Sequence, residues 1–149
     1  MNTLCFSIII NADKQKVWDT MLADKTYRAW TKPFDEGSCY KGSWEKGSEI
    51  RFLTSDDESN AKGMLSKIKE NIKHQFISIE HIGFIYNGVI DTTSEEVKKW
   101  TPAFENYSFS ESGGKTELTI DVHVPDEYKS MFEETWPKAL SALKNLCEQ

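Results

Sequence analysis

Hydrophobic and polar residues change their spacing several times along the chain. Residues 3–11 alternate, which predicts a strand. Residues 14–22 then place apolar side chains four residues apart after Asp13, a residue type that often caps helices. Residues 24–30 predict a second short helix, which Asp24 could cap and which ends near Pro33. The alternating pattern returns after this proline, so the sequence predicts one strand, two short helices and then a series of strands.

The strands of this series are separated by polar and glycine-rich turns, such as the loop at residues 55–60 and the turn at residues 112–115. Residues 83–100 have the least regular pattern, although residues 93–100 could form one or two helical turns capped by Thr93 or Ser94. The strands expected in this part of the chain are residues 34–40, 49–53, 63–70, 74–82, 104–110 and 116–124.

The last segment returns to helical spacing and predicts one long amphipathic helix over residues 126–147. Pro137 lies inside it, and we expect a kink rather than a break because the apolar stripe continues beyond the proline. The stripe consists of Phe132, Trp136, Ala139, Leu140, Leu143 and Cys147. A helix with one apolar face must pack on the preceding sheet, which predicts an α+β fold. We expect a curved antiparallel sheet of about six to seven strands around this helix, with a cavity between them.

Length and charge narrow the possible functions. The 149 residues suit one domain spanning residues 1–149. The net charge is −6 without a basic stripe, so we expect neither nucleic acid nor a membrane as a partner. The three cysteines have no metal or disulfide spacing, and the N-terminus has no signal-peptide pattern. These features predict a cytoplasmic protein.

Motifs for the common cofactors and nucleophiles are missing from the sequence. It contains no dinucleotide or P-loop glycine motif and no GxSxG nucleophile elbow. It also lacks the HExxH pattern and any carboxylate cluster with metal spacing. We therefore expect no cofactor and no metal.

Several short stretches resemble a known superfamily. They are residues 12–18 (ADKQKVW), 27–31 (YRAWT), 42–48 (GSWEKGS), 105–109 (ENYSF), 113–118 (GGKTEL) and 136–143. In their order these stretches resemble the START-like or Bet v 1-like helix-grip superfamily (SRPBCC), in the branch related to the C-terminal domain of the activator of Hsp90 ATPase. The resemblance covers essentially the whole chain, but its motifs are turn glycines, caps and core tryptophans rather than a catalytic signature. It implies a β-α-α-β6-α helix-grip fold, and a function among lipid or small-hydrophobe binding, aromatic cyclisation and co-chaperone action.

The candidate ligand-binding residues are those that alternation places on the concave face of the sheet, together with apolar helix residues that face it. A one-residue slip in any strand would invert its list. On the sheet the candidates are Phe52, Met64, Ile68, Ile77, Ile79, His81, Glu105, Tyr107, Phe109, Leu118 and Ile120, and on the helices they are Trp30, Trp136 and Leu140. Polar groups among apolar ones need partners or a ligand, so His81, Glu105 and Tyr107 are of special interest.

Three functions are consistent with these residues. The favoured hypothesis is a binding protein for a small hydrophobic molecule, monomeric or homodimeric, whose ligand is oriented by the three polar side chains. One alternative is a module that stimulates an Hsp90-type chaperone, although the chain shows no N-terminal domain ahead of the helix-grip part. The other is a cyclase- or hydrolase-like enzyme, in which Glu105 or His81 would perform acid–base chemistry. The simpler expectation for this pair is that the two side chains satisfy each other.

Overall fold

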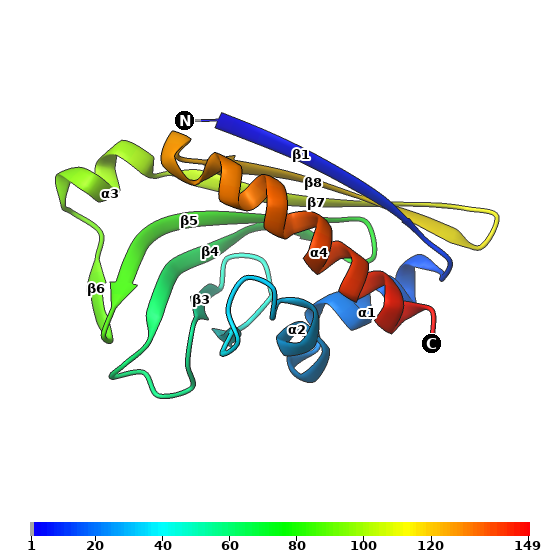
Figure 1. Ribbon diagram of the computed structural model, residues 1–149, viewed down its shortest axis with the longest axis horizontal. Helices are drawn as coiled ribbons and strands as arrows, with labels where there is room; N and C mark the ends of the chain where they lie inside the picture. The colour runs from blue at the N-terminus through cyan, green and yellow to red at the C-terminus, as the bar shows by residue number, and fades with distance from the viewer. Residues whose placement is uncertain (1) are drawn as a thin grey trace.

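The computed structural model describes residues 2–149 and shows one curved sheet with a long helix lying across its concave face (Figure 1). The strands are β1 (Asn2–Ile10), β2 (Cys39–Gly42), β3 (Glu49–Leu53), β4 (Lys62–Ile72), β5 (Phe76–Tyr86), β6 (Val89–Asp91), β7 (Ala103–Ser112) and β8 (Lys115–Val124). The helices are α1 (Lys14–Leu22), α2 (Asp24–Trp30), α3 (Glu95–Trp100), a 3-10 turn at Asp126–Tyr128 and α4 (Lys129–Cys147).

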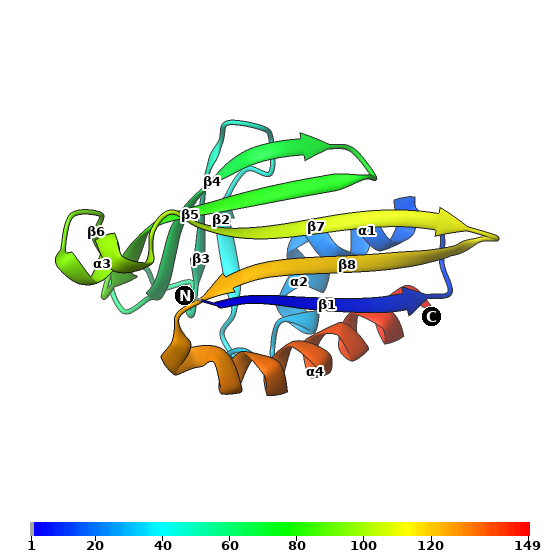
Figure 2. The same ribbon diagram turned by 90° about the horizontal axis from the view of Figure 1, so that it is seen from above.

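The eight strands form a single antiparallel sheet in the order β1-β8-β7-β5-β4-β3-β2, and β6 pairs with the end of β5. Helix α4 crosses one face of this sheet (Figure 1). The pair α1 and α2 lies towards the C-terminal end of α4, whereas α3 and β6 lie at the opposite end of the molecule (Figure 2). The α+β helix-grip class predicted from the sequence is therefore confirmed.

Local signals explain most of the helix boundaries. The Asp13 carboxylate accepts a hydrogen bond from the Lys16 backbone N–H at 2.8 Å and so caps α1. The Ser94 hydroxyl does the same for the Val97 N–H at 3.2 Å, which decides between the two caps considered for α3. Helix α4 continues unbroken across Pro137.

Three sequence expectations differ from the structure. Residues 34–38 form turns rather than the start of a strand, and β2 begins at Cys39. Helix α2 has no side-chain cap, because Asp24 is its first residue and pairs instead with Arg28 at 3.2 Å. The strand expected at residues 74–82 runs on to Tyr86 and returns as β6, a short hairpin that the irregular pattern of residues 83–100 did not indicate.

The main hydrophobic core lies where α1, α2 and the C-terminal part of α4 cover the sheet. Its fully buried members come from all of these layers and include Val17, Ile77, Leu118 and Leu143. At ~25 cal/mol per Å² of buried apolar surface, this layer is the main source of stability. No helix within residues 2–149 has the length and apolar character needed to span a membrane.

A β-bulge changes the direction of side chains in the middle of β5. Leu65 lies opposite Gly83 and Ser66 lies opposite His81, so Ile82 has no partner on β4. Strict alternation would place His81 and Phe84 on opposite faces of the sheet. The additional residue brings both onto the concave face, where both line the same cavity.

Candidate ligand-binding cavity

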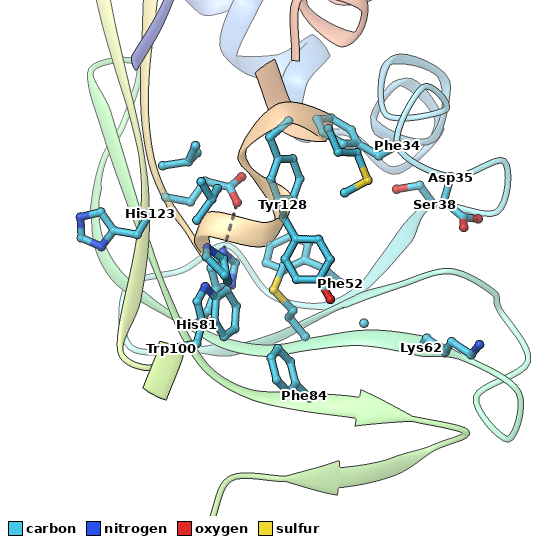
Figure 3. Close-up of a pocket in the computed structure, with 18 of the residues that line it drawn as sticks. Phe34, Asp35, Ser38, Phe52, Lys62, His81, Phe84, Trp100, His123 and Tyr128 are labelled. Carbon is cyan, nitrogen blue, oxygen red and sulfur yellow. Dashed lines mark hydrogen bonds and ion pairs between the residues drawn. The ribbon is translucent and has the colours of Figure 1, made fainter. Parts of the chain in front are cut away.

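A cavity of about 880 Å³ opens between the N-terminal part of α4 and the sheet (Figure 3). Strands β3, β4, β5, β7 and β8 supply its floor, and α2, α3 and the start of α4 supply its sides. Its aromatic lining residues are Tyr27, Trp30, Phe34, Phe52, Phe84, Trp100, Tyr107, Tyr128, Phe132 and Trp136. A cavity of this size and character suits a small, mostly apolar molecule.

Aromatic contacts hold the walls in place. The Trp136 ring lies edge-on to Phe34 with the ring centroids 5.0 Å apart, and it also contacts Tyr107 at 6.1 Å. On the other side of the cavity, Tyr27 lies edge-on to Trp30 at 5.6 Å. Such pairs fix ring orientation in addition to burying apolar surface. The cavity walls are therefore formed before any ligand enters.

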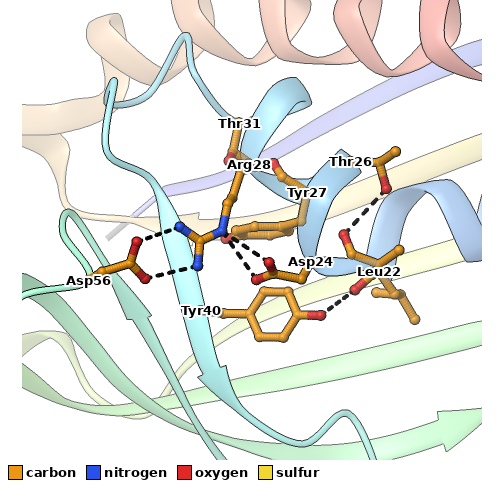
Figure 4. A network of polar contacts seen from close by, with 9 residues as sticks. Leu22, Asp24, Thr26, Tyr27, Arg28, Thr31, Tyr40 and Asp56 are labelled. Carbon is orange, nitrogen blue, oxygen red and sulfur yellow. Dashed lines mark hydrogen bonds and ion pairs between the residues drawn. The ribbon is translucent and has the colours of Figure 1, made fainter.

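An ion-paired network fastens α2, which carries Tyr27 and Trp30, to the loop after β3 (Figure 4). The Arg28 guanidinium donates two hydrogen bonds to Asp56, at 2.7 and 2.9 Å, and its Nε contacts Asp24. This bidentate contact holds the pKa of the Asp56 carboxyl below its usual value. The network is exposed, so it orients α2 rather than contributing much stability.

Four polar side chains form a continuous hydrogen-bonded chain beside the cavity. Ser66 Oγ lies 2.7 Å from His81 Nδ1, and His81 Nε2 lies 3.1 Å from Glu105 Oε1. The Tyr107 hydroxyl donates to the other oxygen of Glu105. His81, Glu105 and Tyr107 line the cavity, whereas Ser66 lies behind His81. The three polar residues singled out from the sequence thus lie together, joined by a fourth.

The hydrogen bonds also indicate where the protons lie. Ser66 is fully buried, and within residues 2–149 its hydroxyl has no acceptor other than His81 Nδ1. A buried hydroxyl needs an acceptor, so Ser66 donates to Nδ1 and the ring proton lies on Nε2, directed at Glu105. One neutral imidazole therefore satisfies the whole chain.

The order Ser66, His81, Glu105 resembles a hydrolase triad, but the arrangement is unsuited to nucleophilic attack. A nucleophilic serine must reach a bound substrate. Ser66 has no exposed surface and does not line the cavity, because the imidazole lies between it and the open space. Its role here is to orient His81.

The two tyrosines near Glu105 remain protonated over the ordinary pH range. Burial raises the pKa of the Tyr107 hydroxyl well above its usual value, and the negative charge of Glu105 raises it further. Burial and the same charge raise the pKa of Tyr27 as well. Tyr107 therefore acts as a hydrogen-bond donor to the carboxylate.

The candidate residues from the sequence fall into two groups. Those that line the cavity are Trp30, Phe52, Met64, His81, Glu105, Tyr107 and Trp136. Those that lie in the core and do not line the cavity are Ile68, Ile77, Ile79, Phe109, Leu118, Ile120 and Leu140. The second group shares the concave face but lies towards the end of the sheet that the helices cover, so their placement as cavity residues is corrected. Whether the first group contacts a ligand remains a prediction.

Sequence reasoning missed part of the cavity wall. Phe84 follows the bulge, and Trp100 comes from α3 and lies parallel to the rings of His81 and Phe84, at 5.6 and 5.0 Å. The indole N–H of Trp100 is buried without a partner in the described chain. The sequence held one usable signal for Trp100: Val97 and Trp100 lie three residues apart after the Ser94 cap, which indicates a helix with a buried face.

Within residues 2–149, no group of three or more His, Cys, Asp or Glu side chains has an arrangement that could hold a metal ion. The cavity does contain ionisable side chains, among which His81, Glu105 and Tyr107 are hydrogen-bonded to one another. The site consists of apolar walls and a chain of hydrogen-bonded polar side chains.

Comparison with known proteins identifies the fold. No family model matches the sequence, and no curated protein is similar to it. Solved structures do match. The Aha1 dimer from Colwellia psychrerythraea has a TM-score of 0.72 at 16% identity, covering 99% of this chain and 97% of that chain. The chain has the helix-grip fold.

Two further helix-grip structures are similar over nearly the whole chain. Protein CV1439 from Chromobacterium violaceum has a TM-score of 0.70 at 16% identity, covering 100% of this chain and 99% of that one. CalU16 from Micromonospora echinospora has a TM-score of 0.66 at 14% identity, and the match covers 97% of this chain and 75% of the CalU16 chain. Identities this low establish the fold and not the activity.

Proposed function

We propose that this helix-grip protein binds a small, largely apolar molecule in the cavity between α4 and the sheet. The observation that carries the proposal is the cavity itself, about 880 Å³ in volume, with ten aromatic residues in its lining and the hydrogen-bonded His81, Glu105 and Tyr107 in its wall. Transfer of apolar ligand surface into it would contribute ~25 cal/mol per Å². His81, Glu105 and Tyr107 would orient the polar end of the ligand.

Native mass spectrometry of the gently purified protein tests this proposal, together with titration of a neutral apolar dye such as N-phenyl-naphthylamine. We expect an added mass that disappears on denaturation, or saturable dye binding. The replacement Met64→Trp fills the cavity from β4 and should abolish both signals.

A matched control comes from the same strand. Ile72 lies at the other end of β4, is exposed and does not line the cavity, so Ile72→Trp should leave binding unchanged. Absence of any bound mass together with no dye binding would refute the proposal. Equal binding by the Met64→Trp and Ile72→Trp variants would place the ligand elsewhere.

A second candidate is acid–base catalysis on the bound molecule, favoured by one observation. The Glu105 carboxylate faces the cavity, and His81 Nε2 is 3.1 Å away, which is a geometry suited to proton transfer. A search for turnover with the wild type and with a Glu105→Gln, His81→Ala double variant separates catalysis from binding. Undiminished activity in the double variant would exclude this pair as the catalytic groups.

Membership of the branch related to the activator of Hsp90 ATPase also remains a proposal. Its support is the sequence resemblance and the shared fold with the Aha1 dimer. An ATPase assay with an Hsp90-type chaperone tests it, and stimulation by the Met64→Trp variant would show that the effect is independent of the cavity. No stimulation by the wild type would dispose of this role.

A further inference from the structure

We infer that the ligand carries a cationic amine, which the Glu105 carboxylate and the surrounding aromatic rings bind together. This inference rests on the proposed binding function and specifies the chemical class of the ligand. It follows from the charge of Glu105, from the lack of a fixed cation beside it, and from the rings and charges around the cavity.

The Glu105 carboxylate is largely buried, and His81 is the one basic side chain within residues 2–149 that contacts it. The Glu105 side chain is 20% exposed, at the cavity wall. Within the described chain, no lysine or arginine nitrogen lies within ion-pair distance of it, and its partners are the Tyr107 hydroxyl and the His81 ring. Buried charges in proteins are normally paired. The missing partner is a cation.

His81 does not supply this cation. Because its hydroxyl has no other acceptor within residues 2–149, we assign Ser66 as the donor to Nδ1, and this assignment leaves Nδ1 without a proton. The ring then donates from Nε2 as a neutral group. Each carboxylate oxygen accepts one hydrogen bond and keeps another acceptor position, so Glu105 can accept a further donor from the cavity.

Aromatic rings surround the space that Glu105 faces. Tyr107 and Trp136 are in contact with each other, and Phe52 lies edge-on to His81 at 6.1 Å. An ammonium group over the face of an aromatic ring is attracted by its quadrupole, more strongly when water is excluded. A carboxylate among aromatic rings is therefore a good environment for an organic cation and a poor one for an anion.

The rim of the cavity carries more carboxylates than lysines. Its exposed carboxylates include Asp35, Glu96 and Glu127, against two exposed lysines, Lys62 and Lys99. The Lys62 ammonium lies over the Tyr86 ring at 5.0 Å, which draws it away from the cavity. The negative excess attracts cations and disfavours fatty acids and other carboxylates.

Three ligands with the same apolar chain test the inference: decylamine, decanol and decanoate, measured near neutral pH by displacement of N-phenyl-naphthylamine. We expect decylamine to bind roughly tenfold more tightly than decanol, and decanoate to bind most weakly. Glu105→Gln keeps the shape of the side chain and removes its charge. This replacement should remove the preference for decylamine while changing the affinity for decanol less than about twofold.

A matched control separates Glu105 from the rim. Glu96→Gln removes an exposed carboxylate at the edge of the cavity and should have an effect that added salt abolishes, whereas the Glu105 effect should persist in salt. The ranking of ligands on the unaltered protein decides the question even if Glu105→Gln folds poorly.

The outcomes distinguish this inference from the binding function itself. If neither the dye nor any of the three compounds binds, the proposed function is wrong. If decanol or decanoate binds as tightly as decylamine, the function stands and the inference is overturned. A Glu105→Gln variant that folds and keeps the full preference for decylamine would also overturn it.

Discussion

At the scale of single residues, the polar chain of Ser66, His81, Glu105 and Tyr107 shows how one buried hydroxyl can determine the state of a cavity wall. Ser66 contacts no ligand space, yet its hydrogen bond fixes which ring nitrogen of His81 carries the proton. That choice directs the Nε2 proton at Glu105, whose side chain lines the cavity. Ser66, which determines the position of the ring proton, is thus not itself a lining residue of the cavity.

Replacement of Ser66 by alanine should therefore destabilise the protein. The change leaves His81 Nδ1 buried without its donor, and we expect a loss of about 1–3 kcal/mol in the free energy of unfolding. Urea denaturation followed by fluorescence measures it. Ser78→Ala is the matched control, because Ser78 is also buried on a neighbouring strand and its hydroxyl has no hydrogen bond within residues 2–149. Equal effects of the two substitutions would contradict the role given to Ser66.

The sequence was sufficient to predict which polar side chains face inward, but not how far the cavity extends. Alternation placed His81, Glu105 and Tyr107 correctly on the concave face. It could not place Phe84, because a bulge is a feature of the pairing between two strands and leaves no mark in the alternation of either one. The error concerns one residue, and it reverses the face of all that follow it on β5.

At the scale of elements, α3 and the end of β5 that carries Phe84 close one end of the cavity. The Asp91 carboxylate accepts hydrogen bonds from the backbone N–H groups of Thr93 and Ser94, at 3.1 and 3.0 Å, and so shapes the turn that leads into α3. The Ser94 side chain, followed by these backbone bonds, lowers the pKa of Asp91. The sequence indicated the helix through its capping signals and missed β6, whose three residues are too few to show a period.

The effect of Asp91 on stability should depend on pH. A carboxyl whose pKa is lowered by folding stabilises the protein above its ordinary pKa, and the contribution disappears as the pH falls through the lowered value. The difference in urea midpoint between the wild type and Asp91→Ala should therefore be largest near neutral pH and vanish in acid. Asp91→Asn keeps the acceptor oxygen without the titrating proton and is the control. A gap between wild type and Asp91→Ala that stays constant from about pH 6 to about pH 3 would contradict the prediction.

Helix α4 contains a proline whose replacement should stabilise the protein. Pro137 is exposed in the interior of the helix and cannot donate to the carbonyl of Glu133. Proline is about 3 kcal/mol less favourable than alanine in such a position, and loss of its restriction on the unfolded chain returns about 1 kcal/mol. We expect Pro137→Ala to raise the free energy of unfolding by about 1–2 kcal/mol.

Thermal and urea denaturation measure this change. Lys138→Ala, at the next exposed position of the same helix, should alter stability by less than about 0.5 kcal/mol. A decrease in stability on replacing Pro137 would mean that the surrounding elements are adapted to the proline.

At the scale of the whole molecule, the central strands β5 and β7 each contribute to both the core and the cavity. Strand β5 passes from Ile77 and Ile79 in the core to His81 at the cavity, and β7 passes from Phe109 to Tyr107 and Glu105 in the same way. Sequence alternation reports the face of a residue but not its position under the crossing helix. For this reason the inner face could be predicted from the sequence, while its division into core and cavity could not.

This division predicts that stability and binding respond to different substitutions. Leu140→Ala truncates a buried side chain of α4 in the core and should cost about 2–5 kcal/mol of unfolding free energy, with dye affinity unchanged. Phe132→Ala truncates a half-buried side chain two turns earlier, on the cavity wall, and should cost less stability but weaken dye binding. Urea denaturation and dye titration of both variants check the pair. Parallel losses in both quantities would show that core and cavity are not separate.

The bulge at Ile82 has a consequence for how such a cavity can diverge. Deleting Ile82 would leave Phe84 two positions after His81 and therefore on the same face. Inserting one residue between Gly83 and Phe84, with the pairing continued, would instead turn the side chain of Phe84 away from the cavity. The preceding part of the strand, with Ile77 and Ile79, would keep its pairing and its place in the core. A one-codon insertion beside the bulge would therefore reshape the ligand space in one step. Descendants of one ancestral sequence could acquire different ligands in this way while the rest of the fold is inherited unchanged.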